Sequence, residues 1–309
     1  MNMTIALVMK KIRRKVDTLL RFAWHVEAIV DEIKINQGLI LSELNKSKRS
    51  RDLRDYEFKV FSQWGDDGLI QKLIDTIEIE NKTFIEFGVQ DFYESNCRFL
   101  MTKDNWAGFV IDGSASNIRR LKASHFYWRH ALEAIAAFLS RANINEILAR
   151  SKFDHDLGLL SIDIDGVDYF VLEAIDYYKP RILIVEFNAI FGPERKITVP
   201  YDERFCRTDK HHSNLYFGAS LSALTHLANK KGYELVGINS ACVNAFFVRK
   251  DLVNEKLQVL TPEQAYTPSA FRESRDSRGN ASYLSGDARL AAIKGLPVTN
   301  VETGASETV

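Results

Sequence analysis

The sequence predicts a doubly wound α/β fold, and three observations lead to that prediction. Four nearly continuous apolar stretches of strand length follow one another along the chain, at residues 83–88, 108–113, 157–166 and 181–188. Each finishes at or beside an acidic residue, and helix-like sequence separates it from the next. Two further stretches, 233–239 and 244–249, are joined by only a few residues. Unbroken apolar strands are typical of parallel sheets, because helices cover both of their faces.

The first element along the chain is a long helix, which the proline-free residues 4–47 predict. Phe22 and Ile29 lie off its heptad seam, so its apolar face is wider than a two-stranded coiled coil requires. The helix could pack against its own domain, join protomers into a homo-oligomer, or contact a membrane surface peripherally. The basic cluster at residues 10–15 suggests membrane contact. The seam, in alternating steps of four and three residues, is Ile12, Val16, Leu19, Ala23, Val26, Val30, Ile33, Gln37, Ile40 and Leu44.

The two ends of the predicted sheet domain are also visible in the sequence. Residues 45–55 are polar and resemble a hinge. At the other end, residues 271–280 are charged and loop-like, and a short helix and a strand at residues 296–301 are expected after them.

The last two strands of the sheet narrow the fold class. A connection of a few residues cannot hold a crossover helix, so residues 233–239 and 244–249 should pair antiparallel. An open, mostly parallel sheet with one antiparallel strand is the plan of class I methyltransferases, and not of the usual dinucleotide dehydrogenases. We therefore expect a Rossmann-like sheet of that class, preceded by a long N-terminal helix.

Composition limits the function. The 309 residues include 41 Lys plus Arg and 41 Asp plus Glu, so the formal charge is 41 − 41 = 0. A nucleic-acid binder would need excess cations to neutralise phosphates, so a nucleic-acid partner is not expected. The 46% hydrophobic fraction argues against wholesale disorder.

The cysteines and the apolar runs bear on location. Three widely separated cysteines are too few for a disulfide framework, which favours a reducing compartment. The basic cluster near the N-terminus follows a short apolar stretch, whereas a secretory signal has the opposite order. No run approaches the ~18 apolar residues that span a bilayer. We expect a cytoplasmic protein, at most peripheral to a membrane.

The strand ends define the expected ligand site, because open α/β sheets bind ligands beyond the carboxyl ends of their strands. Glu86, Gly88 and Gln90 end the first predicted strand. Gly88 permits a tight turn. A dinucleotide pyrophosphate motif needs two more glycines, and Gln90 and Phe92 occupy their places, so a cofactor without a pyrophosphate fits better. Asp112, at the end of the second strand, could accept hydrogen bonds from both hydroxyls of a ribose, or could be a solvated turn residue.

Two neighbouring segments are weaker candidates. Asn96 belongs to a short polar segment that could cap the next helix. The loop at residues 61–68, which includes Gln63, combines polar side chains with two glycines just before a helix. It could close over a cofactor or simply lead into that helix.

The densest polar group follows the third and fourth strands: Asp163, Asp165 and Asp168 after the third, then Glu186 and Asn188 at the end of the fourth. Strand alternation would point the first two to one side, and likewise the last two. If the strands are neighbours, these oxygens converge, and their mutual repulsion calls for a proton, an arginine or a hard cation. Oxygen ligands suit Mg²⁺ or Mn²⁺. Cofactor or substrate hydrogen bonding without a metal, and a structural role, are the alternatives.

A long insertion between residues 188 and 221 is a candidate substrate lid. It carries His211 and His212, either of which could remove a proton from a substrate hydroxyl, although both could be ordinary surface histidines. Arg272, Arg275 and Arg278 could grip a phosphate or carboxylate, but a solvated, salt-paired loop is the simpler interpretation.

With these residues assembled, residues 61–249 resemble the FkbM-like S-adenosylmethionine-dependent methyltransferases. The matching segments are Phe84-Ile-Glu-Phe-Gly-Val, Val110-Ile-Asp-Gly-Ser and Leu159-Leu-Ser-Ile-Asp-Ile-Asp-Gly-Val-Asp-Tyr-Phe-Val-Leu-Glu. The family usually has glutamate where Asp165 stands. The acidic pairs also look similar to those of metal-assisted sugar O-methyltransferases. The resemblance divides the chain into an N-terminal helix (1–50), a methyltransferase domain (56–250) and a C-terminal extension (251–309).

The resemblance implies that Glu86, Gly88 and Gln90 line the methionine part of S-adenosylmethionine. It implies that Asp112 holds the ribose, with Gly113 and Ser114 beside it. The expected activity is methyl transfer to a hydroxyl of a glycan or nucleotide-sugar, with Asp163, a histidine or a metal-bound hydroxyl taking the proton. A catalytically silent scaffold of a glycan-assembly complex and an NAD-dependent sugar-modifying enzyme remain as alternatives.

Overall fold

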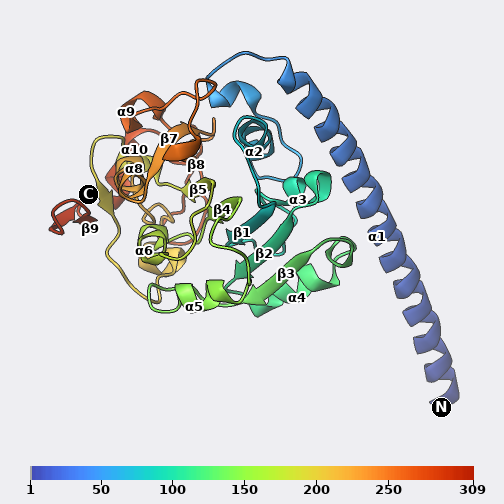
Figure 1. The fold of residues 1–309 in the computed structure, drawn as a ribbon. Helices are drawn as coiled ribbons and strands as arrows, with labels where there is room; N and C mark the ends of the chain where they lie inside the picture. The colour runs from blue at the N-terminus through green and yellow to red at the C-terminus, as the bar shows by residue number, and fades with distance from the viewer. Residues whose placement is uncertain (1) are drawn as a thin grey trace.

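The computed structural model describes the backbone of residues 2–309, and the side chains of residues 2–8, 10–12 and 20 are outside the description. A long helix, α1 (Asn2–Lys46), leads into a rounded α/β body and projects well beyond it at its N-terminal end (Figure 1). A short loop and a 3₁₀ turn (Leu53–Tyr56) join α1 to the body. The long N-terminal helix is therefore confirmed.

The body is built on a seven-stranded sheet with the order β3-β2-β1-β4-β5-β8-β7. Only β8 runs antiparallel to its neighbours, and it lies between β5 and β7. This is the Rossmann-like arrangement expected of a class I methyltransferase sheet. The strands are β1 (Thr83–Phe87), β2 (Ala107–Asp112), β3 (Leu132–Ala136), β4 (Leu159–Ile162), β5 (Ile182–Glu186), β7 (Tyr233–Ile238) and β8 (Asn244–Arg249).

Helices cover both faces of this sheet, which explains the unbroken apolar strands. Phe84 of β1 packs into one apolar cluster, whereas Ile85 and Phe87 pack into the other. The first cluster receives α2 (Asp66–Ile74), α3 (Arg98–Asp104) and α4 (Ala115–Ala123). The second receives α5 (Ile144–Ala149), α6 (Asp168–Ala174) and α8 (Leu221–Lys230).

The edge strand β3 is the one strand of the large sheet that sequence reasoning missed. It pairs with β2 alone, and Glu133 points to solvent between the buried Leu132 and Ala134. An edge strand with this alternating pattern lacks the continuous apolar run that marked the other strands.

The C-terminal residues are joined to the insertion between β5 and β7. A three-stranded sheet orders β10 (Ser306–Thr308), β9 (Pro297–Asn300) and β6 (Ile197–Thr198), and β9 matches the strand expected at residues 296–301. Ile293 and Val298 are fully buried in the main core. Two short helices, α9 (Pro262–Ala265) and α10 (Asp287–Ile293), also belong to this region, and α7 (Arg207–Lys210) belongs to the insertion.

Helix α1 contacts the body through a face that does not include its heptad seam. Gly38 is buried, and a Cβ there would lie 2.6 Å from the Phe99 and Val60 side chains. Asp31 forms an ion pair with Arg98, whose side chain is 2% exposed. Every seam residue from Val16 to Leu44 is solvent-exposed. The first seam residue, Ile12, and the basic Lys10 and Lys11 have side chains outside the described residues.

Within residues 2–309, no helix combines the length and the apolar character that crossing a bilayer would demand.

Candidate active site

Three adjoining cavities open at the carboxyl ends of the strands, with volumes of about 530, 290 and 230 Å³. Gly88, Gln90 and Asp163 line all three, and together we call these cavities the cleft. The cleft lies where the strand order changes direction, between β1 and β4, which is where open α/β sheets bind ligands.

All nine residues predicted to contact the cofactor line this cleft, although they come from four separate segments. They are Gln63, Glu86, Gly88, Gln90, Asn96, Asp112, Gly113, Ser114 and Asp163.

Gly88 sits at the point of closest approach between the β1 and β4 ends. Its φ of 72° is left-handed, and a Cβ there would lie 1.6 Å from the backbone oxygen of Asp163. Its N–H donates to the Ile111 oxygen at 2.9 Å, which ties the loop to β2. Only glycine fits this position.

The loop after Gly88 keeps a glycine-like conformation without further glycines. Gln90 and Phe92, which stand where a dinucleotide motif would have glycine, have φ of 48° and 65°. The Gln90 N–H donates to Asp112 Oδ2 at 2.8 Å, and the Phe92 ring is fully buried. Burial of Phe92 and the hydrogen bond of Gln90 hold these two residues in the left-handed backbone conformation, which residues other than glycine rarely adopt.

Asp112 is held by three hydrogen bonds from its own chain. Besides the Gln90 N–H, the Ser114 N–H donates to its Oδ1 at 2.8 Å, and Asn117 Nδ2 donates to the same oxygen at 2.9 Å. A carboxylate has about four acceptor sites, so one remains for a ligand hydroxyl. The sequence led us to expect hydrogen bonds from both ribose hydroxyls to Asp112, whereas this arrangement leaves one acceptor site unused.

The Glu86 carboxylate holds the segment that leads into α3. It accepts hydrogen bonds from Ser95 Oγ at 2.6 Å, the Asn96 N–H at 2.8 Å and the Cys97 N–H at 3.2 Å. Burial raises the pKa of Glu86, and these donors oppose the shift. The side chain lines the 290 Å³ cavity, but its oxygens are largely occupied by the protein itself.

The loop at residues 61–68 both leads into α2 and lines the cleft. The two roles that the sequence suggested for it, helix entry and a place beside the ligand, are therefore compatible. The buried Asp67 Oδ2 accepts the N–H groups of Val60, Phe61 and Ser62 at 2.7–2.9 Å, which fixes the loop. Trp64 lines the 530 Å³ cavity next to Gln63 and packs edge-on against Phe271, with ring centroids 5.2 Å apart.

The predicted carboxylate cluster forms at the ends of β4 and β5, which are parallel neighbours. One oxygen from each of Asp163, Asp165 and Glu186 lies within 4.8 Å of the others. Strand alternation does not bring the aspartates together, because β4 ends at Ile162. A tight turn does so, with Asp165 at φ 57°.

Asp168 holds that turn in place. Its buried carboxylate accepts the Ile164 N–H at 2.8 Å on Oδ1 and the Gly166 N–H at 3.0 Å on Oδ2. It is the residue that shapes the cluster, although sequence reasoning had placed it only among the neighbouring acids.

Burial and the crowding of carboxylates raise the pKa of two members of the cluster. Burial first, and then the neighbouring Asp165 and Asp168, raise the pKa of Asp163 to about 8. The same causes, with Asp163 itself the nearest charge, raise the pKa of Glu186 well above its usual range. Glu186 is 8% exposed, and its Oε2 has no hydrogen-bond partner among the described residues.

Arg207, at the start of α7, forms an ion pair with the cluster, whereas the sequence indicated it only as one polar residue of the insertion. Its Nη1 lies 2.6 Å from Asp165 Oδ1, and its guanidinium stacks on the Phe217 ring at 3.8 Å. Its Nε donates to the Asn214 oxygen at 2.6 Å. These contacts fix a positive charge beside the carboxylates. The insertion holds three arginines, and nothing in the sequence marks Arg207 as the one that reaches the cluster.

Asn188, a predicted metal ligand, anchors the insertion to the end of β5. Its Nδ2 donates to the oxygens of Leu215 and Phe217 at 2.9 and 3.0 Å, and its Oδ1 accepts the Ile190 N–H at 3.0 Å. An amide oxygen has two lone pairs, so one is left and the role of metal ligand stays a prediction.

His211 and His212 do not line any of the three cavities. His211 Nδ1 is 2.7 Å from Ser213 Oγ, and burial and the adjacent His212 lower its pKa. His212 is exposed. Within the cleft, the groups placed to accept a proton are therefore carboxylates and not these histidines.

The insertion and the C-terminal residues wall the outer part of the cleft. Phe205, Phe271 and Arg289 line the 530 Å³ cavity, and Arg289 is 7% exposed with no partner for its Nε among the described residues. None of the three belongs to a sequence motif.

Two of the three arginines at residues 272–278 donate hydrogen bonds within their own loop. Arg272 donates to the Tyr283 oxygen from Nε and Nη2, and Arg275 Nη1 donates to the Gly279 oxygen at 3.0 Å. These contacts agree with the simpler interpretation of that segment.

Solved methyltransferase structures are similar to this chain at low sequence identity. An O-methyltransferase family protein from Burkholderia thailandensis is 11% identical, with a TM-score of 0.37 over 60% of this chain; the match spans 58% of that protein. M. capricolum TrmK in complex with S-adenosylhomocysteine is 12% identical, with a TM-score of 0.38 over 64% of this chain and 74% of its own. The N-terminal domain of EvdMO1 with SAH bound is 10% identical, with a TM-score of 0.38 over 61% and 80%. No protein-family model and no curated protein matches the sequence.

Proposed function

We propose that the protein is an S-adenosylmethionine-dependent O-methyltransferase that acts on a sugar hydroxyl of a glycan or nucleotide-sugar. The observation that carries this proposal is the convergence of nine residues, selected from sequence alone, on one cleft at the switch point of a sheet with the class I strand order. Within it, Asp112 would receive a ribose hydroxyl, and the Gly88–Gln90 loop would border the methionine part.

The bound cofactor would supply an electrophilic methyl group on a sulfonium. The protein has then to align an acceptor hydroxyl and take its proton as the new carbon–oxygen bond forms and the carbon–sulfur bond breaks, with S-adenosylhomocysteine leaving. Asp163 and Glu186 are the groups placed for the proton, because burial and repulsion make their ionised forms strong bases.

The carboxylate cluster could also bind a divalent cation, which we include in the proposal. Asp163, Asp165 and Glu186 offer oxygens within 4.8 Å of one another, and the unpartnered Glu186 Oε2 fits a missing ligand bond. An all-oxygen donor set suits Mg²⁺ or Mn²⁺. Such an ion would lower the pKa of an acceptor hydroxyl. Arg207 competes for Asp165, so a cation would have to displace or share that ion pair.

The outer cleft suits a sugar with an anionic group. Aromatic rings such as Phe205 and Phe271 can cover the apolar face of a sugar ring, while Arg289 lies at the same wall with part of its guanidinium unpaired. An arginine in that place can pair with a phosphate or carboxylate.

The test is release of S-adenosylhomocysteine from S-adenosylmethionine across a panel of oligosaccharides and nucleotide-sugars, with and without Mg²⁺ or Mn²⁺. We expect Glu186→Gln to reduce turnover by at least about 100-fold, the usual contribution of a general base, and Asp154→Asn, an exposed acid outside the cleft, to leave it unchanged. Cofactor binding without turnover on any acceptor would favour a scaffold. Binding of NAD in place of S-adenosylmethionine would overturn the proposal.

A further inference from the structure

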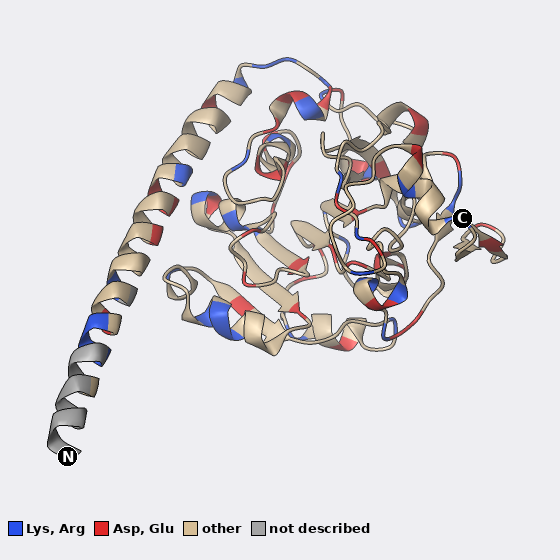
Figure 2. Ribbon diagram, turned by 180° about the vertical axis from the view of Figure 1, so that it is seen from behind, with Lys and Arg blue, Asp and Glu red and all other residues tan. Residues whose placement is uncertain are grey.

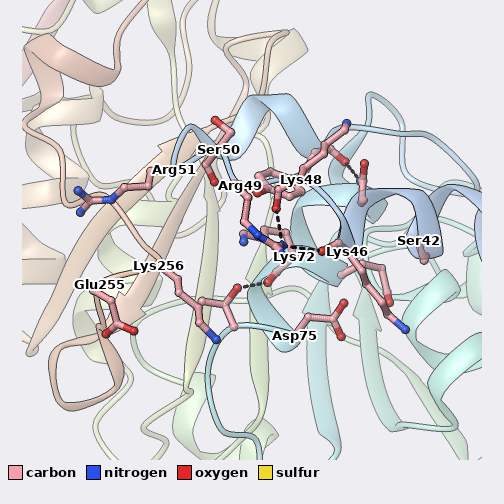
Figure 3. A pocket seen from close by; sticks show the side chains of 14 residues that line it. Ser42, Lys46, Lys48, Arg49, Ser50, Arg51, Lys72, Asp75, Glu255 and Lys256 are labelled. Atoms are coloured by element: carbon pink, nitrogen blue, oxygen red, sulfur yellow. Dashed lines mark hydrogen bonds between the residues drawn. The ribbon is translucent and has the colours of Figure 1, made fainter.

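A second large cavity, of about 720 Å³, lies away from the cleft at the C-terminal end of α1 (Figure 3). It is enclosed by the last turn of α1, the loop that follows, α2 and the segment at residues 255–256. It shares no lining residue with the three cavities of the cleft. Segments far apart in the sequence thus build a separate concave site.

The lining of this cavity is strongly basic. Its charged residues are Lys46, Lys48, Arg49, Arg51, Lys72 and Lys256 against Asp75 and Glu255, so its formal charge is 6 − 2 = +4. The whole chain sums to zero. Figure 2 shows the same concentration as a blue stretch in the loop that follows α1.

Five of these six cations lack a carboxylate partner within 4.0 Å among the described residues, since only Lys46 has one, Glu43: the five are Lys48, Arg49, Arg51, Lys72 and Lys256. Backbone oxygens hold the two arginines, since Arg49 Nη1 donates to the Lys46 oxygen at 3.1 Å and Arg51 Nη2 to the Leu257 oxygen at 2.8 Å. Their remaining N–H groups stay available.

Lys72 occupies the centre of this charge. Its Nζ lies 4.4 Å from the centroid of the Tyr56 ring, which holds the ammonium in place. Burial, followed by the nearby Lys256 and Arg49, lowers the pKa of Lys72. Like charges gathered around a hollow destabilise one another unless an anion lies between them.

We propose that this basic cavity is a binding site for a phosphate-bearing anion, with Arg49, Lys72 and Lys256 as its principal donors. Its volume exceeds that of one phosphate, so a ligand with two or more anionic groups fits best. A soluble diphosphate and a phospholipid headgroup share this chemistry.

Titration calorimetry with inorganic pyrophosphate tests the site on the full chain. We expect binding that weakens as salt is added, and a Kd about 100-fold higher in the double variant Lys72→Gln/Lys256→Gln, from about tenfold for each charged hydrogen bond. Lys72→Arg should retain affinity, and Arg119→Gln/Lys122→Gln on the exposed face of α4 is the matched control.

Flotation with vesicles of phosphatidylcholine, with and without phosphatidylglycerol, distinguishes the two sources. Binding that needs phosphatidylglycerol and disappears in the Lys72→Gln/Lys256→Gln variant would assign the headgroup. The proposal fails if neither pyrophosphate nor vesicles bind, or if the double variant binds as well as the unaltered protein.

A different observation carries a second proposal, which concerns the unpartnered face of α1. Its seam from Val16 to Leu44 covers about four heptads and is exposed throughout. The face that docks on the body is separate, because successive residues such as Gln37 on the seam and the buried Gly38 point about 100° apart. A second helix can therefore lie on the seam without displacing the body.

We infer that a second copy of this chain covers the seam as a parallel, in-register partner. The seam from Val16 to Leu44 lies in the less basic part of α1, because residues 16–46 carry 3 Lys plus Arg and 5 Asp plus Glu, so 3 − 5 = −2, whereas the basic cluster at residues 10–15 precedes it. Gln37 is the one polar residue of the seam, and in a parallel register it faces Gln37 of the second copy. An antiparallel partner would set this amide against an apolar side chain.

Light scattering of the full chain tests this pairing. We expect twice the 35.3 kDa chain mass, and the single chain mass for Ile33→Glu/Ile40→Glu. Thr18→Glu/His25→Glu adds the same charge at exposed positions off the seam and should leave the dimer intact. A monomeric unaltered protein would overturn the inference, as would a dimer that survives the seam substitutions.

Cysteine cross-linking tests the direction of the helices. All three native cysteines are free, and only Cys206 is exposed, so Cys206→Ser provides the background. In it, Leu19→Cys and Ile40→Cys, made separately, should each form a disulfide between two copies, because an antiparallel pair brings identical seam residues together only at its two-fold axis. Absence of either cross-link under oxidising conditions would rule out the parallel arrangement.

Discussion

The Cβ position of Gly88 falls 1.6 Å from the backbone oxygen of Asp163, so the ends of β1 and β4 meet with no room for any side chain between them. This contact sets the floor of the cleft, and the cavities on both sides of it include these two residues. Geometry at the switch point thus depends on one glycine.

Gly88→Ala should therefore destabilise the fold and open the cleft. The new methyl group meets backbone, and the left-handed φ adds strain, so we expect the free energy of unfolding to fall by about 3 kcal/mol. Urea denaturation measures it. Gly113→Ala, in the same cleft but with its nearest neighbour at 3.5 Å, is the control and should cost no more than about 0.5 kcal/mol. Equal losses in the two variants would refute the role of the contact.

Replacing Gln90 with glycine should stabilise the folded protein. Its φ of 48° is costly for a residue with a Cβ, and the cost is on the order of 1 kcal/mol. Gln90→Gly is expected to raise the free energy of unfolding in the absence of ligand. Gln63→Gly, at a cleft residue outside the left-handed region, should lower it. A fall of similar size in both variants would show that the Gln90 backbone is not strained.

The Asp31–Arg98 pair should anchor α1 to the body. Arg98 is 2% exposed and lies between the Phe61 and Phe126 rings at 4.0 and 3.9 Å, so removing its counter-charge leaves a buried cation. Asp31→Ala is expected to cost about 3 kcal/mol in thermal or urea denaturation. The exposed pair Lys59–Glu94 supplies the comparison, because Glu94→Gln should cost less than about 1 kcal/mol.

Asp66 should make stability depend on pH. Burial raises its pKa to about 7, although Asn239 and Asn244 donate hydrogen bonds to it. Since the folded pKa lies above the unfolded value, the folded state binds the extra proton between about pH 4 and 7. Stability from this group is therefore lost as pH rises through that window, by at most on the order of 4 kcal/mol.

Asp66→Asn isolates that effect from the other carboxyl groups. Asn244 Oδ1 has no partner among the described residues, so a rotated Asn244 amide can accept from the new amide. Urea midpoints of both proteins at pH 4.5 to 8 should diverge, with the variant gaining over the unaltered protein as pH rises. Parallel curves would contradict the raised pKa.

The sequence was sufficient for the central strands and for the residues that line the inner part of the cleft, because both are encoded locally. Each strand carries its own apolar run and its own terminal polar residue, as β1 does with Glu86 and Gly88. The strand order then brings those ends together. The edge strand β3 was not predicted, because only one of its faces is buried and its sequence therefore lacks a continuous apolar run.

The outer cleft could not be predicted in the same way. Arg207, Phe271 and Arg289 come from the insertion and the C-terminal region, and only tertiary packing places them beside the carboxylates. The anchoring role of Asn188 was not predicted, because its hydrogen bonds to Leu215 and Phe217 join segments that are far apart in the sequence. The type of a residue indicates which chemistry it could perform, but its hydrogen-bond partners determine which of its polar atoms remain available to a ligand.

Titration calorimetry with S-adenosylmethionine is the most direct test of the central claim that the cleft holds this cofactor. We expect binding to one site on the unaltered chain, at least about tenfold weaker binding by Asp112→Ala through loss of a charged hydrogen bond, and unchanged binding by the exposed Asp154→Ala. Circular dichroism of each variant verifies its fold. Absence of binding by the unaltered protein, with and without Mg²⁺, would contradict the assignment.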